Sequence, residues 1–525
     1  MTMTDPLTRL AILHGTDKYG YHDYTPHYHR LLGPLRDRVQ RMLEIGVGGY
    51  KNATRGGESL AMWRDYFPAA QITGLDIVRK TLNLGPRIEI RQGSQVDGDC
   101  LSRLTAERGP FDLILDDGSH RNSHVVESFR LLFPTLAPGG IYIIEDVQTA
   151  FFPPFGGSLA LVEPNSVAMA LDRMARLQAG RGGGIDRIER FHNLIVFHKR
   201  VAGQERSPAA NDSHLRAAKA RRREPVMAEA GTLDIARLGD LIERAGEGGV
   251  IVVQGAWRDR ALLADLFAQV DHREIAVYFP KAPLTGFATR IAGLSIYPEA
   301  VLLLVGANDY PSNFAFDIGH PQVAAVVAEM GEVLKDRAAS QTALLRYLRL
   351  KDLQGNGRVG VEILDRLQAM GCRHPLYFLQ RAEILIDRGQ WGDLLSLCRA
   401  ALAGAPEHPR LTALLGLALR RTGQAEAALR LLREAHARMP QALPVIHALA
   451  EAEFDCGNSA AASDLLAGAI ELFPADEKPA RLRDLIRMAR AAGDARAAFG
   501  AALRLQQIDP DAVSIHSQPA TPEAG

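Results

Sequence analysis

A 34-residue period runs through the last third of this 525-residue chain. Four glycines recur at that interval: Gly355, Gly389, Gly423 and Gly457. Three prolines do the same: Pro406, Pro440 and Pro474. Between them lie Ala- and Leu-rich segments at helical spacing, with Gly suited to the turn inside a unit and Pro to the end of its second helix. The period predicts stacked helix pairs, with four clear units over about 374–511 and a degenerate unit at about 340–373.

This period, with the positions of its Gly and Pro residues, resembles the tetratricopeptide repeat family. The resemblance implies an all-α solenoid over residues 340–511, followed by a disordered tail at 512–525. Stacked helix pairs bury a continuous apolar seam and expose a concave face. Because such arrays rarely perform chemistry, we expect this one to bind a protein partner or to mediate self-association.

The first two hundred residues have a different texture, in which short β-rich runs alternate with helical stretches. The runs lie at 41–46, 71–77, 87–91, 111–117, 140–146 and 193–199. This alternation is typical of a parallel α/β sheet. We therefore assign residues 1–200 to one α/β domain.

Two further segments separate that domain from the repeats. Residues 201–230 are polar and basic. We interpret them as a solvated linker or an exposed helix, because they lack the aromatic residues that a nucleic-acid-binding arm uses for stacking. Residues 231–336 show a second, smaller α/β texture, with strands expected at 249–255, 274–280 and 300–306. No motif in this region names a chemistry, and its polar loop at 308–317 adds none.

Composition and charge exclude several kinds of partner. Lys plus Arg and Asp plus Glu both number 61, so no overall positive field would attract nucleic acid. No apolar run approaches the roughly 20 residues of a membrane span, and the first residues lack the pattern of a signal peptide. The four cysteines are scattered, without metal-site spacing. We therefore expect a cytoplasmic protein with reduced, buried thiols.

A glycine-rich turn follows the first predicted strand, in the sequence RMLEIGVGGYKNATRGGES. Glycines there allow a sharp turn and let a ligand approach the backbone. The next strand, QITGLDI, ends near Asp76, whose carboxylate could accept hydrogen bonds from both ribose hydroxyls. Dinucleotide-binding and methyltransferase domains share this arrangement. The turn has no GxxxxGK(S/T) and no clean GxGxxG, which favours S-adenosylmethionine over NAD.

Acidic side chains follow the fourth and fifth predicted strands. FDLILDDGSH carries Asp116, Asp117 and His120, and GGIYIIEDVQT carries Glu145 and Asp146. One crossover helix separates the strands, so their carboxyl ends should meet at the edge where open α/β sheets bind ligands. Carboxylates so close together repel unless a cation lies among them, and Mg²⁺ prefers oxygen ligands. The alternatives are that the acids cap helices or bind backbone amides, and that His120, a candidate base, is only a hydrogen-bonded loop histidine.

Nine motifs between residues 14 and 199 together resemble a known family. The motifs are HGTDK, YTPHY, LEIGVGGY, MWRDYFP, GLDI, RQGSQVD, DDGSH, IEDVQT and FHNLIVF. They resemble the class I, metal-dependent sugar O-methyltransferases of macrolide biosynthesis, of the mycinamicin type, and the related cephalosporin hydroxylase-like domains. The resemblance implies a Rossmann-like sheet. Relatives carry a tyrosine where this chain has Phe191, so any contact through that hydroxyl is lost.

The resemblance also implies roles for individual residues. Through DDGSH, His120 would be the general base. Three acids would bind Mg²⁺ or Mn²⁺: Asp117, Glu145 and Asp146. Five residues would contact S-adenosylmethionine, the last two near its adenosyl end: Glu44, Gly46, Asp76, Gln95 and Asp97.

These expectations combine into one predicted function. We predict a Mg²⁺- and S-adenosylmethionine-dependent O-methyltransferase that acts on a hydroxyl of a sugar, a glycosylated natural product or a glycan. Two alternatives stay open at this point. The same site could serve a non-sugar, catechol-like acceptor, or the chain could be a repeat-based scaffold whose first domain is inactive. The number of acids at one sheet edge argues against the scaffold.

Overall fold

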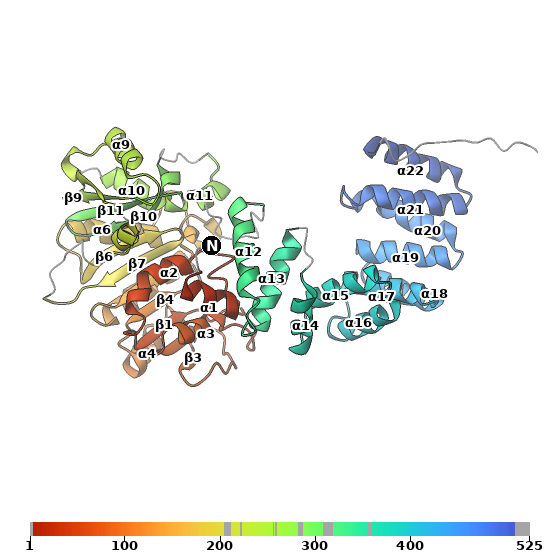
Figure 1. Cartoon of the computed structure of the whole chain (residues 1–525), viewed down its shortest axis with the longest axis horizontal. Coiled ribbons are helices and arrows are strands. Elements are labelled where there is room, and N and C mark those ends of the chain that lie inside the picture. Colours follow the sequence, from red (N-terminus) through yellow and green to blue (C-terminus); the bar gives the residue numbers. More distant parts are fainter. Residues whose placement is uncertain are drawn as a thin grey trace, which may run out of the picture. The chain divides into compact units, whose positions relative to one another are not determined.

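The computed structural model describes residues 4–203, 212–220, 223–255, 257, 260–281, 287–307, 319–354 and 359–509. The chain divides into two compact units, Met1–Tyr347 and Leu348–Gly525. Figure 1 shows a sheet with covering helices in the first unit and paired helices in the second. Three features named from the sequence lie outside the described residues: the loop at 308–317, Gly355 and the tail at 512–525.

Eleven strands form one sheet in the described part of the first unit, in the order β3-β2-β1-β4-β5-β7-β6-β10-β11-β9-β8. Six of them coincide with the six predicted runs: β1 (Arg41–Ile45), β2 (Gln71–Asp76), β3 (Ile88–Gln92), β4 (Leu113–Asp116), β5 (Ile141–Ile144) and β7 (Leu194–Lys199). β1 to β5 pair in parallel, and β7 runs antiparallel to β5. The predicted α/β fold is confirmed. The strand β6 (Ile185–Phe191) was not predicted, because charged residues interrupt its apolar run.

Helices alternate with these strands and cover the sheet. They are α1 (Pro6–His14), α2 (Thr25–Leu32), α3 (Glu58–Tyr66), α4 (Gly98–Arg108), α5 (Asn122–Leu132) and α6 (Ser166–Gln178). Because helices cover them, β4 and β5 are buried along their whole length and read as continuous apolar runs. Asp116, the last residue of β4, pairs with Ile45 of β1 and Ile144 of β5. The segments that follow these three strands therefore start at the same edge.

The region predicted as a separate α/β segment at 231–336 instead extends the same sheet. Its strands are β8 (Val226–Glu229), β9 (Val250–Gln254), β10 (Ile291–Ile296) and β11 (Ala300–Val305), and β10 pairs with β6. The strands expected at 249–255 and 300–306 are confirmed. The strand expected at 274–280 is wrong, because this run forms the helix α11 (His272–Tyr278). A short apolar run fits a buried helix as well as a strand.

The segment interpreted as a solvated linker, 201–230, is also partly built into this unit. Its described residues include β8 and the helix α8 (Ser213–Ala220). Asp212 and Ser213 are fully buried. Tyr297 donates a hydrogen bond to Asp212 Oδ2 at 2.9 Å, and Ser213 Oγ donates to Glu189 Oε2 at 2.7 Å. The helix was not predicted because basic residues dominate this stretch, although the apolar side of the helix packs on β9 and β11.

Further helices complete the first unit. They are α9 (Ile235–Ala245), α10 (Arg260–Ala268), the 3-10 turn η6 (Gln269–Asp271), α12 (Pro321–Val333) and α13 (Gln341–Leu353), which crosses the boundary between the units. The start of α13 lies against the end of α1. Ser340 N donates to Leu13 O at 2.9 Å, and a Cβ on Gly15 would meet Ala343 N at 2.5 Å. The predicted start of the repeats at residue 340 therefore differs from the structure, where this first helix begins in the first unit.

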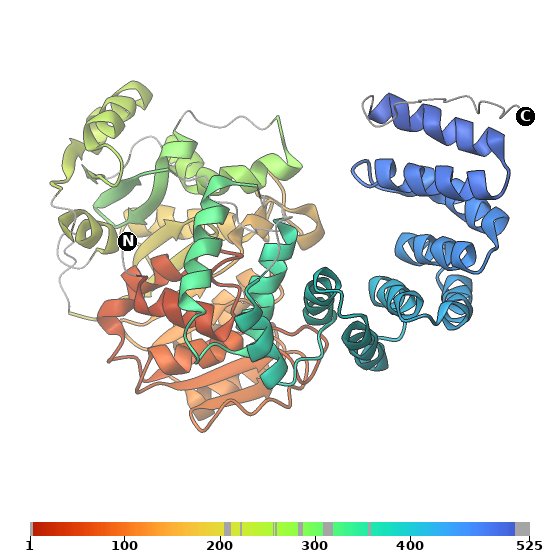
Figure 2. The same ribbon diagram turned by 45° about the vertical axis from the view of Figure 1, so that its right-hand side comes forward.

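The second unit is a row of antiparallel helix pairs, drawn in teal to blue in Figure 2. The helices are α14 (Val361–Ala369), α15 (Pro375–Asp387), α16 (Trp391–Gly404), α17 (Pro409–Arg421), α18 (Ala425–Arg438), α19 (Leu443–Asp455), α20 (Ser459–Ala469), α21 (Lys478–Ala491) and α22 (Ala495–Ile508). Gly423 has φ +77°, as expected for a residue that ends one helix and starts the turn to the next. A Cβ on Gly416 of α17 would lie 2.7 Å from Leu432 of α18, so a small residue lets the pair pack closely. The predicted helical repeats are confirmed. Among the described residues, no helix is both long and apolar enough to cross a lipid bilayer.

Candidate active site

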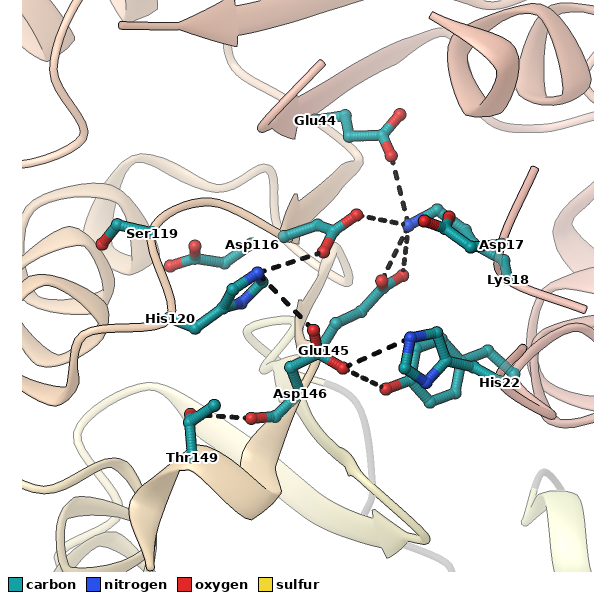
Figure 3. Close-up of polar contacts among 12 residues, drawn as sticks. Asp17, Lys18, His22, Glu44, Asp116, Ser119, His120, Glu145, Asp146 and Thr149 are labelled. Carbon is teal, nitrogen blue, oxygen red and sulfur yellow. Dashed lines mark hydrogen bonds and ion pairs between the residues drawn. The ribbon is translucent and has the colours of Figure 1, made fainter. Parts of the chain in front are cut away.

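The predicted acids meet at the carboxyl edge of β1, β4 and β5. Asp117 follows β4, and Glu145 and Asp146 follow β5. The two segments are joined by a hydrogen bond from Glu145 N to Asp116 O at 3.0 Å. Figure 3 shows the side chains of Glu44, Glu145, Asp146 and His120 around one small region. The strand ends therefore bring these groups together, as expected from the sequence.

A lysine from outside the sheet lies in the middle of the acids. Lys18 Nζ is 2.8 Å from Asp117 Oδ2, 2.7 Å from Glu145 Oε2 and 3.4 Å from Glu44 Oε1, and its side chain is 1% exposed (Figure 3). Burial alone would lower the pKa of Lys18, but the charges of Asp117, Glu145 and Glu44 raise it well above its ordinary value. The ammonium group therefore supplies part of the positive charge that the sequence led us to assign to a metal ion.

Glu145 is bound to Lys18 through both of its oxygens. Lys18 Nζ donates to Glu145 Oε1 at 2.8 Å and to Oε2 at 2.7 Å, and Tyr28 OH donates to Oε1 at 2.5 Å. The Glu145 side chain is 2% exposed. The family resemblance predicts Glu145 as one of three metal ligands, but the structure turns its carboxylate toward Lys18. The contacts with Lys18 and Tyr28 hold the carboxylate in this direction.

Asp146, Asp117 and His120 form the group that could hold a cation. One ligand atom of each lies within 4.8 Å of the others. His120 Nε2 is 3.5 Å from Asp146 Oδ2 and 3.9 Å from Asp117 Oδ1. Tyr24 OH donates to Asp146 Oδ1 at 2.6 Å, and His22 Nε2 lies 3.9 Å from the same oxygen. The side chains of Asp117, His120 and Asp146 are partly exposed, so a ligand can reach them.

Two members of this group have unusual backbone conformations. His120 has φ +55° and Asp146 has φ +52°, the left-handed region that residues other than Gly rarely adopt. Such a conformation costs on the order of 1–3 kcal/mol and persists only where the surroundings enforce it. Its presence at two facing positions of the same site indicates that the fold maintains the directions of these side chains.

Asp116 and Gln95 form a hydrogen-bonded pair that holds the turn after β4 in place. Asp116 Oδ2 accepts hydrogen bonds from Ser128 Oγ at 2.6 Å and Tyr142 OH at 3.0 Å, and its side chain is buried. Gln95 Nε2 donates to Asp116 Oδ1 at 3.1 Å, and Gln95 Oε1 accepts from Ser119 N at 2.8 Å. Gln95 thus stabilises the turn that carries His120. The family resemblance instead predicts that Gln95 lies near the adenosyl end of the cofactor.

The glycine-rich turn after β1 stands beside Asp76. Gly46 has φ +92°, and a Cβ there would lie 2.0 Å from Asp117 O, so only Gly lets the ends of β1 and β4 approach so closely. Asp76 accepts from Val47 N at 3.1 Å and from Val78 N at 2.8 Å, one amide on each oxygen. Each carboxylate oxygen retains a second lone pair for a ligand. Lys80 Nζ donates to the carbonyls of Gly48 and Tyr50, at 2.5 and 2.9 Å, and so holds the turn.

The two remaining predicted cofactor residues have other partners. Asp97 caps α4, because its Oδ1 accepts from Asp99 N at 3.1 Å and Cys100 N at 3.0 Å. Glu44 is fully buried beside Lys18. Burial raises the pKa of Glu44 to about 7, and the Lys18 charge opposes that rise. Each of the two residues thus has a structural role of its own.

The segment before the sheet contributes residues that were not predicted from the sequence. Lys18, His22, Tyr24 and Tyr28 all reach the acids from the loop before α2 or from α2 itself. The only signal was the presence of the motifs HGTDK and YTPHY among those that resemble the family. Their roles could not be deduced, because no local pattern shows that α2 packs over the carboxyl edge of the sheet.

Comparison with known proteins finds two family models that match this chain. Residues 54–147, which include Asp76, Asp117, His120 and Asp146, match the family model described as a methyltransferase domain. The first unit contains a methyltransferase domain. Residues 419–486 match the model of the tetratricopeptide repeat, as expected from the sequence.

Curated relatives of the methyltransferase domain are named as O-methyltransferases. Mycinamicin VI 2''-O-methyltransferase of Micromonospora griseorubida is 46% identical over 166 residues, which is 31% of this chain and 42% of that protein. The 8-demethyl-8-alpha-L-rhamnosyl tetracenomycin-C 2'-O-methyltransferase of Streptomyces olivaceus is 45% identical over 152 residues, 29% of this chain and 40% of that protein. The chain thus spans less than half the length of these relatives. Among solved structures, MycE methyltransferase of the mycinamycin pathway, in complex with Mg, SAH and mycinamycin VI, shares 39% identity over 39% of this chain and 57% of that one, with a TM-score of 0.36.

Proposed function

We propose that the methyltransferase domain moves a methyl group from S-adenosylmethionine to a hydroxyl of a sugar, in a glycosylated natural product or a glycan, with the help of Mg²⁺ or Mn²⁺. The observation that carries the proposal is the convergence of Asp117, His120 and Asp146 at one sheet edge, inside the stretch that matches the methyltransferase family. The names of the curated relatives support a sugar hydroxyl, since one is named for a rhamnosyl group that it methylates at O-2'.

The donor set at this edge fits a hard divalent cation. Asp117 and Asp146 offer carboxylate oxygens, and Mg²⁺ is commonly bound by one or two carboxylates with the rest of its shell left to water and substrate. His120 Nε2 lies 3.5 Å from Asp146 Oδ2 and 3.9 Å from Asp117 Oδ1, and we assign this residue the role of base. We assign Glu145 to the binding of Lys18, which keeps the ammonium group next to Asp117.

The turn after β1 fits the cofactor. Asp76 stands at the end of β2 with lone pairs left for ribose hydroxyls, and Gly46 brings the backbone of β1 close to β4. We assign supporting roles to Glu44, Gln95 and Asp97, which contact Lys18, Asp116 and the first turn of α4 respectively.

The chemistry divides between the bound groups and the chain. When bound, S-adenosylmethionine supplies an electrophilic methyl group and the divalent cation supplies positive charge that lowers the pKa of a neighbouring hydroxyl. Asp117 and Asp146 would hold the cation through their carboxylate oxygens. His120 Nε2 accepts the hydroxyl proton, a role that imidazole fills near neutral pH. Tyr24 and His22 hold Asp146 in place through its Oδ1.

The repeats give the chain a second activity, which we propose to be the binding of a protein partner or of a second copy. The matched repeat family supports this role, because stacked helix pairs present an extended concave surface.

Methyl transfer from labelled S-adenosylmethionine to a panel of rhamnosyl, other glycosyl and catechol acceptors tests the proposal. We expect transfer to glycosyl acceptors, loss of transfer in EDTA, and recovery with Mg²⁺ or Mn²⁺. His120→Ala should lower the rate by about 10²–10⁴-fold, the usual effect of a positioned base. Glu127→Gln, on the exposed side of α5, is the matched control and should leave the rate unchanged. Transfer to catechols alone would refute the sugar acceptor, and the absence of transfer to any acceptor would favour an inactive domain.

A further inference from the structure

Asp146 owes its backbone conformation to contacts made by the short helix that follows it. Asp146 precedes the 3-10 helix η3 (Val147–Ala150), and Thr149 Oγ1 donates to Asp146 O at 2.7 Å (Figure 3). The first two backbone amides of η3 donate their hydrogen bonds to one residue outside this helix, Asn193, which lies between β6 and β7. Val147 N donates to Asn193 O at 3.2 Å, and Gln148 N donates to Asn193 Oδ1 at 3.2 Å.

Asn193 lies in the two-residue turn between β6 and β7, where Phe191 pairs with Leu194. It is fully buried and has φ +55°, a conformation that Asn tolerates better than most residues. The turn belongs to FHNLIVF, a motif of the sequence to which neither cofactor nor metal binding assigns a role. Since both acceptors of Asn193 face η3, this residue fixes the position of the turn that carries Asp146.

Asn193 is in turn held by the sheet extension. Asn193 N donates to Asp271 Oδ1 at 2.7 Å, and Asp271 Oδ2 binds Arg190, with both side chains of that ion pair 0% exposed. Arg190 Nη1 also donates to Phe191 O at 2.6 Å and to Leu194 O at 3.1 Å, the two residues that flank the turn. The first turn residue, His192, has its Nε2 3.0 Å from Glu274 Oε1 of α11.

We propose that Asn193 is a positioning residue for Asp146, and that Asp271 of the sheet extension holds Asn193 in that role. This inference rests on the proposed function, because it treats Asp146 as a metal ligand. The inference also gives a role to the sheet extension, in which the sequence shows no catalytic motif. Through Asp271 and Asn193, the extension would hold Asp146 in position at the metal site. Partners of metal ligands commonly change metal affinity by about 10–100-fold when they are replaced.

The test uses the full chain, with Mn²⁺ as the probe. Asn193→Gly removes the Oδ1 acceptor while Gly readily keeps φ +55°. We expect Mn²⁺ binding, measured by titration with paramagnetic resonance, to weaken by roughly tenfold, with faster amide exchange at Val147 and Gln148. The affinity for S-adenosylhomocysteine should not change. Asp271→Asn, which breaks the pair with Arg190, should give the same two changes.

The control is Asp234→Ala, which removes the cap of α9 in the same extension without touching the turn. It should lower stability and leave both Mn²⁺ affinity and the exchange of the two amides unchanged. Parent-like exchange at Val147 and Gln148 in Asn193→Gly would overturn the inference, whatever the metal does. Faster exchange with parent-like Mn²⁺ affinity would also overturn it, because Asn193 would then order the turn without positioning the ligand. A parent chain that binds no Mn²⁺ would instead overturn the proposed metal site, and the positioning role with it.

Discussion

Replacing Lys18 by Met removes the one cation that the described residues place among Glu44, Asp117 and Glu145. Its Nζ lies 2.7–3.4 Å from the three carboxylates, and its side chain is 1% exposed. Taking one partner from a buried ion pair leaves the opposite charge unpaired and costs about 3–5 kcal/mol. Since domains are stable by about 5–15 kcal/mol, we expect Lys18→Met to lose a large part of the free energy of unfolding.

Tryptophan fluorescence during urea unfolding measures this loss. The chain has three tryptophans, and in a Trp391→Phe background the signal comes from Trp63 and Trp257, both buried in the first unit. Mn²⁺ should restore stability to Lys18→Met more than to the parent, because it can supply the missing charge. At a hundredfold excess over its dissociation constant, a ligand stabilises by about 2.7 kcal/mol.

A matched control separates this effect from the loss of any lysine. Lys335 is paired with Glu332 but is 69% exposed, so Lys335→Met should change the free energy of unfolding by less than about 0.5 kcal/mol. A loss below about 1 kcal/mol in Lys18→Met, well under the cost of an unpaired buried charge, would refute the reasoning. It would mean that the acids do not depend on Lys18 for charge balance, for instance because some of them are protonated.

Three further predictions follow from other parts of the fold. Truncation after residue 337 removes Ser340 and Ala343, which contact the end of α1, and should lower the melting temperature of the first unit. Truncation after residue 354 keeps these contacts and should not lower it, so equal melting temperatures would contradict the assignment of the start of α13 to the first unit. Gly46→Ala places a Cβ 2.0 Å from Asp117 O and should reduce both stability and the affinity for S-adenosylhomocysteine, measured by calorimetry; parent-like values would contradict the close approach. Burial would raise the pKa of Glu189, but the hydrogen bond with His198 and the Arg187 charge hold it well below its ordinary value. Its stabilisation is therefore present above about pH 4.3 and lost as the pH falls further, so acid unfolding should be less steep in Glu189→Gln than in the parent.

Much of the fold follows from local patterns that survive in the structure. All six runs at the start of the chain are strands, and in β4 and β5 burial on both faces is what made the run continuous and apolar. The repeats follow from Gly and Pro positions that depend only on nearby backbone, as Gly423 shows. The predictions from sequence fail where tertiary contacts determine the secondary structure. The helix α11 reads as a strand, and β10 was not predicted because Gly293 interrupts its apolar run, at a point where a Cβ would lie only 2.9 Å from Arg190 O.

The candidate site shows the same division. The acids after β4 and β5 could be predicted, because parallel strands bring their carboxyl ends to one edge. The partner of Glu145 could not be predicted. Lys18 lies 127 positions away in the chain and reaches the acids only when α2 packs over the sheet. Mutual repulsion of the acids indicated that a cation was needed but did not distinguish an ammonium group from a metal ion. Gln95 and Asp97 matched a motif, whereas their structural contacts depend on α4 and the turn at His120.

The central claim is a divalent cation held by Asp117 and Asp146, with His120 beside it and Glu145 left on Lys18. Anomalous diffraction from crystals of the protein soaked in Mn²⁺ and S-adenosylhomocysteine tests this most directly. We predict one strong anomalous peak at about 2.0–2.2 Å from a carboxylate oxygen of each of the two aspartates, with Lys18 still bound to Glu145. A peak bound to Glu145 with Lys18 displaced, or no peak at this edge, would contradict the claim.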